Sequence, residues 1–97
     1  MTKKLNPIHP GEILREEFMV PLGLSSNALA RALDVTPARI NEIVRERRGI
    51  SADTALRLAR YFTTSHEFWM NLQAHYDVEI ARAAAGRAIA HITPLAA

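Results

Sequence analysis

The residues most suited to chemistry lie between positions 36 and 51, which read TPARINEIVRERRGIS. Thr36 followed by Pro37 is typical of a helix start, because the hydroxyl can cap the helix and the missing proline N–H needs no partner there. An apolar stripe of Ile40, Ile43 and Val44 follows at helical spacing. Three arginines come after the stripe: Arg45, Arg47 and Arg48. Guanidinium groups at this end of a half-buried helix are suited to binding phosphate.

The positive charge is concentrated around this helix. The 97-residue chain has a formal net charge of only +2, but residues 39–60 hold six arginines against three acidic residues, a local balance of +3. A basic patch on a small domain is the usual sign of a surface that binds nucleic-acid phosphates. Exposed arginines are also common on ordinary solvated faces, so charge alone favours neither interpretation.

Catalysis and metal binding are not indicated. The chain has no cysteine, which excludes disulfides and thiolate ligands. Its four histidines, at positions 9, 66, 75 and 91, are scattered and do not combine with a carboxylate at metal-ligand spacing. No set of nucleophile, base and orienting group is visible, and there is no glycine-rich phosphate loop. We expect a protein that is not an enzyme and binds no metal or cofactor, with His9 shaping the entry to the first helix.

The pattern is helical almost throughout, and no segment alternates with the period of a strand. The first predicted helix, in HPGEILREEFMV, has Ile13, Leu14 and Phe18 on one face and is stopped by Pro21 and Gly23. The fold class is therefore all-α.

The second and third predicted helices are short and joined by only two residues. Ser25 is the expected N-cap of the second helix, and residues 34–35 form the connection. The third helix runs from the Thr36 cap to about Glu46. The buried stripe of the second helix is Leu29, Ala30 and Leu33.

Two further helices complete the chain. Ser51 is expected to cap the fourth, and Thr64 with Glu67 forms a capping box for a long fifth. The fourth is expected to point Leu56, Ala59 and Phe62 inward. The stripe of the fifth is Phe68, Leu72, Tyr76 and Ile80, joined by Trp69.

Residues 1–85 are interpreted as one domain, followed by a weakly patterned tail at 86–97 that is expected to fray. No apolar run is long enough to span a membrane. The N-terminal MTKKLNPIHPGE lacks the apolar core of a secretory signal. We expect a soluble, cytoplasmic protein.

Two short helices with a tight turn between them, followed by a basic segment, are typical of a helix-turn-helix. The major groove of DNA admits one α-helix, and the third helix can enter it while its apolar stripe stays buried. The start of the second helix can donate to a phosphate. The predicted DNA-binding residues are Ser25, Ser26, Asn27, Thr36, Pro37, Ala38, Arg39, Asn41, Glu42, Arg45, Arg47 and Arg48.

Arg39 is the leading candidate for reading a base, because arginine binds guanine through two hydrogen bonds. It could instead pair with Glu42 or contact a phosphate. Glu42 could accept from cytosine or only orient Arg39, and Asn41 could contact a phosphate or solvent. Arg47 and Arg48 are expected on phosphates. The two arginines of the fourth helix are expected on the surface or in ion pairs.

Three segments together carry a family resemblance: HPGEIL, then INEIV followed by RRGI, and FWMNLQAHYD. Residues 9 to about 80, roughly three quarters of the chain, resemble the HigA antitoxin family, also called virulence-associated protein I-like. This family belongs to the XRE/Cro-repressor superfamily. The resemblance implies a five-helix, lambda-repressor-like domain and a homodimer on an inverted-repeat operator. When the gene is paired, it also implies a HigB-like toxin, a ribosome-dependent mRNA endonuclease, which the antitoxin neutralises while repressing its own operon.

The fifth helix is expected to offer a dimer or toxin interface, with two-fold symmetry between the copies. The candidates are Trp69, Leu72, Tyr76 and Ile80. Two alternatives stay open. One is an XRE-type regulator without a toxin partner, and the other is a protein-interaction module whose helix-turn-helix no longer reads DNA.

The sequence departs from the family pattern at two turns. Many relatives have glycine where Asp34 stands, but aspartate tolerates the left-handed conformation, so we expect the turn to survive. Many also have Asn-Gly where this chain has Arg45 and Glu46. Glu46 has the wrong sign for a phosphate contact, unless it pairs with a neighbouring arginine.

Overall fold

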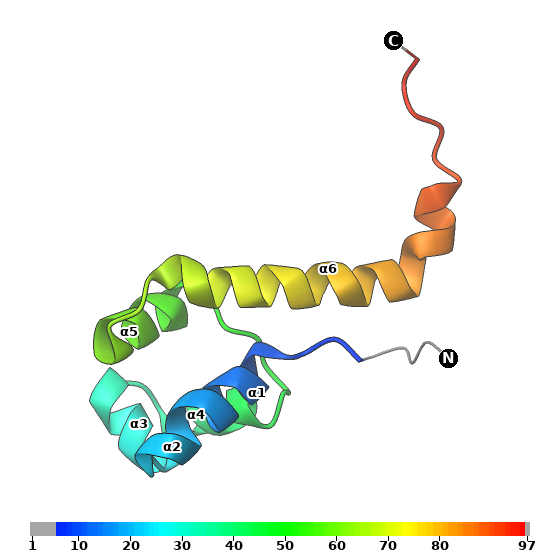
Figure 1. Cartoon of the computed structure of the whole chain (residues 1–97). Helices are drawn as coiled ribbons and strands as arrows, with labels where there is room; N and C mark the ends of the chain where they lie inside the picture. The colour runs from blue at the N-terminus through cyan, green and yellow to red at the C-terminus, as the bar shows by residue number, and fades with distance from the viewer. Residues whose placement is uncertain (1–5, 97) are drawn as a thin grey trace.

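The computed structural model describes residues 6–96, and this part of the chain contains helices and connecting segments but no strand (Figure 1). The first predicted helix comprises three consecutive elements: α1 (Pro10–Ile13), a π-helical segment (Leu14–Met19) and α2 (Val20–Leu22). The remaining helices are α3 (Ser26–Leu33), α4 (Pro37–Val44), α5 (Ala52–Phe62) and α6 (His66–Ala90). The predicted five-helix, all-α fold is confirmed.

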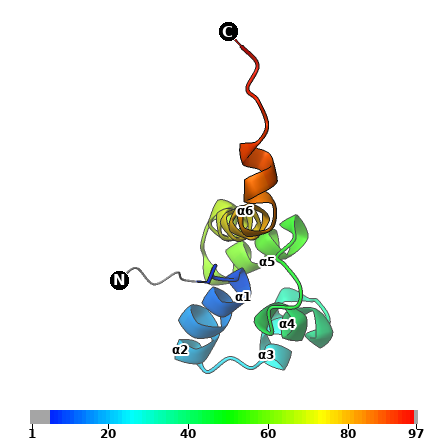
Figure 2. The same cartoon turned by 90° about the vertical axis from the view of Figure 1, so that its right-hand side faces the viewer.

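The helices form a small bundle beneath the long α6. α6 packs on α1 and α5, while α4 packs on α3 and α1. Both views place α3 and α4 on the side of the bundle away from α6 (Figures 1 and 2). No helix in residues 6–96 is both long and apolar enough to cross a bilayer.

The core draws on the π-helical segment and on α3, α4, α5 and α6, each of which turns an apolar face inward. The stripe predicted for α3 is buried, and so are Ile40 and Ile43 of α4, while Val44 is half-buried. The largest fully buried apolar side chains are Trp69, Leu14, Leu29, Ile40, Ile43 and Leu58.

The predicted N-caps of three helices are confirmed. The hydroxyls of Ser25, Thr36 and Ser51 each accept a hydrogen bond from the backbone N–H three residues later. His9 shapes the start of α1 as expected, because its Nδ1 accepts from the Gly11 N–H at 2.9 Å. Burial lowers the pKa of His9, which favours the neutral ring that such an acceptor needs.

The capping box predicted at Thr64 and Glu67 is wrong. Ser65 caps α6 instead, accepting from the Phe68 N–H at 3.1 Å. The Thr64 hydroxyl accepts a hydrogen bond from the indole Nε1–H of Trp69 at 2.8 Å. A buried indole N–H needs such a partner, so the tryptophan uses one of two adjacent hydroxyls and the helix uses the other.

The inward direction predicted for Leu56 is also wrong, because 58% of this residue is exposed. The buried positions of α5 are Thr54, Ala55 and Leu58, with Phe62 half-buried. A threonine can occupy a core position here because its hydroxyl lies 3.3 Å from the Ser51 hydroxyl and forms a hydrogen bond with it.

Two predicted helix ends differ from the structure. Pro21 does not stop the first helix: the Val20 N–H donates to the Arg15 carbonyl in the π-helical pattern, and the helical backbone continues through Pro21 to Leu22. Gly23, at φ +64°, ends it. α6 runs to Ala90, past the boundary at residue 85 where the weakly patterned tail was expected to begin.

Thr63 ends α5 in the left-handed conformation at φ +59°. This conformation costs a side chain with a Cβ about 1–2 kcal/mol. Thr63→Gly is expected to raise the free energy of unfolding by about 0.5–1 kcal/mol, since the relief exceeds the entropy cost of glycine. Urea denaturation measures the change. Thr63→Ala keeps a Cβ and should gain much less; an equal gain would show that the backbone conformation is not the cause.

Candidate nucleic-acid interface

α3 and α4 form the predicted helix-turn-helix, and Asp34 makes the turn. Asp34 adopts the left-handed conformation at φ +58°, as expected. Its N–H donates to the Arg31 carbonyl at 3.2 Å, and the Val35 N–H donates to the Ala30 carbonyl at 3.0 Å. These two bonds satisfy carbonyls at the end of α3 and set the direction in which the chain enters α4.

α4 is held from the side of the first helix. Gly11 allows a close approach of the backbones, because a Cβ at this position would lie 1.8 Å from the carbonyl oxygen of Ile43. The guanidinium of Arg15 donates to the Val44 carbonyl at the end of α4. α4 is therefore fixed by backbone contacts as well as by its apolar stripe.

Residues 45–50, which follow α4 and are called the basic segment below, are bound to α6 by Gln73. Its Oε1 accepts from the Ile50 N–H at 2.6 Å, and its Nε2 donates to Asp77 Oδ1 at 3.0 Å. Gly49 leaves room for this side chain, because a Cβ there would lie 2.9 Å from its amide group. Sequence reasoning missed the role of Gln73. Its one signal was membership of the FWMNLQAHYD segment, which gave no hint of the contact.

Glu46 occupies a position that suits glycine, with φ +63°. The Glu46 N–H donates to the Ile43 carbonyl at 2.9 Å, and the Arg47 N–H donates to the Glu42 carbonyl at 2.8 Å, which closes α4. The Glu46 carboxylate lies 3.6 Å from Nη2 of Arg15. Glu46 does pair with an arginine, but not with a neighbouring one as expected: the partner is Arg15 of the first helix.

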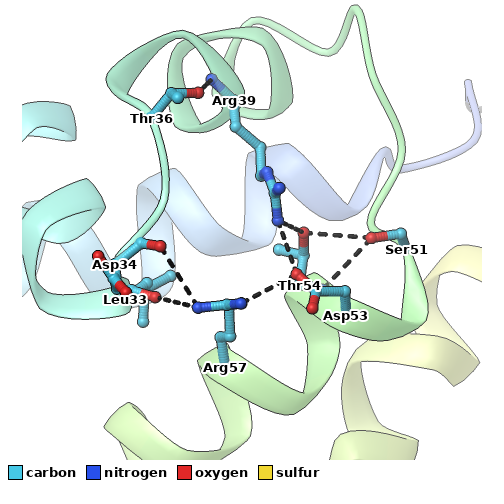
Figure 3. A network of polar contacts seen from close by, with 8 residues as sticks. All are labelled: Leu33, Asp34, Thr36, Arg39, Ser51, Asp53, Thr54 and Arg57. Carbon is cyan, nitrogen blue, oxygen red and sulfur yellow. Dashed lines mark hydrogen bonds and ion pairs between the residues drawn. The ribbon is translucent and has the colours of Figure 1, made fainter.

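A polar network joins the turn, α4 and α5 (Figure 3). Oδ2 of Asp53 accepts from Nη1 of Arg39 at 2.7 Å and from Nε of Arg57 at 2.9 Å. Nη1 of Arg57 also donates to the carbonyls of Leu33 at 2.8 Å and Asp34 at 3.4 Å. The hydrogen bonds from Arg57 and Arg39 lower the pKa of Asp53, because both favour its ionised form.

The ion pairs of α4 show whether Arg39 pairs with Glu42. Arg39 pairs with Asp53, not with Glu42. Glu42 pairs instead with Arg48, whose Nε lies 3.1 Å from Oε1. Arg57 is in an ion pair, as expected for the fourth predicted helix.

All twelve predicted DNA-binding residues retain solvent access. They form three groups: the start of α3, the N-cap and exposed flanks of α4, and the segment after α4. Within residues 6–96, no hydrogen bond joins the group at the start of α3 to the other two groups. The exposed members are Ser25, Asn27, Thr36, Pro37, Ala38, Arg45, Arg47 and Arg48. The half-buried members are Ser26, Arg39, Asn41 and Glu42.

The four residues predicted for a dimer or toxin interface differ in exposure. Trp69 is fully buried, so its assignment to an interface is wrong. Leu72 and Tyr76 are half-buried, and the Tyr76 ring packs edge-on against His9 at 4.8 Å. Ile80 is 43% exposed and remains available to a partner.

Comparison with known proteins agrees with this architecture. Residues 14–69 match the family model described as helix-turn-helix. Virulence-associated protein I of Dichelobacter nodosus is 65% identical over 74 residues, which are 76% of this chain and 68% of that protein. The structure of Pseudomonas aeruginosa antitoxin HigA with the higBA promoter is 58% identical, with a TM-score of 0.90 over 93% of this chain and 99% of that one. Antitoxin GraA in complex with its operator is 48% identical, with a TM-score of 0.89, and covers 100% of this chain and 99% of its own.

The fold and the exposed polar face of α4 define a helix-turn-helix DNA-binding domain of the XRE type. Within that class, the degree of identity to solved HigA structures is decisive. The chain belongs to the HigA antitoxin family.

Proposed function

We propose that this chain is a cytoplasmic antitoxin that binds operator DNA as a homodimer, represses its own operon and neutralises a HigB-like toxin. The observation that carries the proposal is that α4 packs with one face on the bundle and exposes its polar flanks. Its buried face is fixed against α3 and α1, while Arg39, Asn41 and Glu42 keep solvent access on its other flanks. Similarity to antitoxins solved with a promoter or an operator supports the same role.

The proposed mechanism divides the surface into two kinds of contact. The start of α4 enters the major groove, where Arg39 binds a base edge and Ala38 and Pro37 contact a thymine methyl. The start of α3 and the arginines after α4 bind phosphates, which fix the register without reading sequence. Occupation of the operator then excludes the transcription machinery.

A homodimer would place two recognition helices about 34 Å apart, one turn of DNA. The second half of α6 offers the surface for this contact or for the toxin, since Val78 is 51% exposed, Ile80 43% and Ile89 54%. Co-expression with the product of the adjacent gene tests the toxin arm. Co-purification of the two proteins with loss of toxicity supports it. If the neighbouring gene product does not bind this chain and remains toxic, the alternative holds: an XRE-type regulator without a toxin partner.

Arg39→Ala is expected to reduce the preference for the chain's own promoter over unrelated DNA by about 1–3 kcal/mol, or five- to 150-fold, because it removes the base contact. Fluorescence anisotropy with both duplexes at several salt concentrations measures this. Arg47→Ala is the matched control. It should weaken binding to both duplexes alike and lower the salt slope by about one unit, since one phosphate contact is lost. Equal discrimination by wild type and Arg39→Ala would refute base reading by Arg39.

A further inference from the structure

We infer that Asp53 is a positioning residue for DNA recognition: it holds the Arg39 guanidinium in place and thereby contributes to sequence discrimination. The inference rests on the proposed function, since it concerns the arginine that we propose to read a base. Asp53 lies outside the helix-turn-helix, in the first turn of α5, fourteen residues from Arg39.

The contact geometry leaves Arg39 able to bind DNA while it is held. Within residues 6–96, the hydrogen bonds of the Arg39 side chain use Nη1, which donates to Asp53 at 2.7 Å and to the Thr54 hydroxyl at 3.5 Å. The donors on Nε and Nη2 therefore remain for a base edge. Arg39, Arg48 and Asp53 line one open hollow of about 400 Å³ beside α4, so the held guanidinium is accessible from outside.

Asp53 is itself firmly placed. The Oδ2 atom that binds Arg39 also accepts from Nε of Arg57, one turn further along α5, at 2.9 Å. Arg57 in turn donates to the Leu33 carbonyl at the end of α3. The carboxylate that holds Arg39 is thus anchored to the backbone of the helix-turn-helix, and its position follows that of the two DNA-binding helices.

Pre-positioning matters because an arginine side chain loses much rotamer freedom when it is fixed on a partner. A side chain already held near its bound geometry loses less on binding, and the benefit applies only where a well-matched base edge is met. Asp53 and a base edge need not compete for Arg39, because they can use different donors: Asp53 accepts from Nη1, and a base edge would accept from Nε and Nη2.

The test is a double-mutant cycle on DNA discrimination, using the full chain. Asp53→Asn keeps the shape of the side chain and removes the charge that holds Arg39. We expect the ratio of own-promoter to unrelated-DNA affinity to fall about three- to tenfold, a part of the loss from removing Arg39 itself. In the Arg39→Ala background, Asp53→Asn should leave the ratio unchanged, because the residue through which it acts is absent.

Each outcome has one meaning. An unchanged or raised ratio for Asp53→Asn, or an equal fall in both backgrounds, would overturn the inference. Thermal unfolding checks that the variants are folded. If Asp53→Asn is not, the cycle is repeated with Asp53→Glu, which keeps the charge at the start of α5 and displaces the guanidinium by one methylene. Failure of wild type to prefer its promoter would instead contradict the proposed function.

Discussion

Gly11→Ala is expected to destabilise the domain by about 3 kcal/mol or more, a large fraction of the roughly 5–15 kcal/mol that stabilises a typical small domain. The added Cβ would lie 1.8 Å from the carbonyl oxygen of Ile43 and 2.8 Å from its carbonyl carbon. Both atoms belong to the backbone of α4, which cannot turn aside as a flexible side chain can. α1 and α4 would have to separate, and the contacts around buried Leu14 would be lost with them.

Urea denaturation followed by circular dichroism measures the effect. Gly86→Ala is the matched control, because its nearest atom, Cγ of Arg82, would be 3.7 Å from the new Cβ. That substitution lies inside α6 and is expected to stabilise it by about 0.5–1 kcal/mol. A Gly11→Ala midpoint close to wild type would show that α1 can shift without cost, and that Gly11 does not fix the recognition helix.

The local parts of the site could be predicted from the sequence because their causes are local. A hydroxyl at the residue before a helix can cap it through the N–H three residues later, as Ser25, Thr36 and Ser51 do. Asp34 makes a left-handed turn because its short polar side chain tolerates that conformation. Helical periodicity also predicted the buried faces of α3 and α4, which is why the helix-turn-helix could be recognised.

The parts that could not be predicted depend on contacts between distant segments. Arg15 binds a carbonyl 29 residues away, and Gln73 binds an N–H 23 residues away. The sequence offered Glu42, on the same helix, as one possible partner for Arg39, whereas the structure pairs Arg39 with Asp53 of another helix. Periodicity states which face of a helix is buried but not which helix covers it, so these partners had no signal in the sequence.

The basic segment illustrates how such contacts shape function. Its arginines looked like an excess of charge on a short helix, but they lie in a segment whose backbone is tied at both ends. Arg15 and the closing turn at Glu46 hold its beginning, and Gln73 holds its end at Ile50. In the proposed DNA complex, arginines on a fixed backbone would keep a defined spacing, and their phosphate contacts would set the register of α4 in the groove.

Because that last anchor belongs to α6, the attachment of α6 to the bundle should control the site. Trp69 provides this attachment: it is fully buried, and its ring centroid lies 4.9 Å from Phe18 of the first helix and 6.4 Å from Phe62 of α5. Trp69→Ala is expected to cost about 3–5 kcal/mol, through lost burial and an unfilled cavity. Its Nε1 partner, Thr64, would lose its hydrogen bond as well.

The effect on DNA binding separates attachment from simple loss of stability. In conditions where Trp69→Ala is still folded, the tie from Gln73 to Ile50 should loosen, and binding to all duplexes should weaken with discrimination largely kept. Amide exchange at Ile50 reports the tie directly, and anisotropy reports binding. Phe68→Ala is the control, because Phe68 is 38% exposed on the same helix and should cost less stability without freeing Ile50. If folded Trp69→Ala protects Ile50 as well as wild type does, α6 holds the basic segment independently of its aromatic anchor.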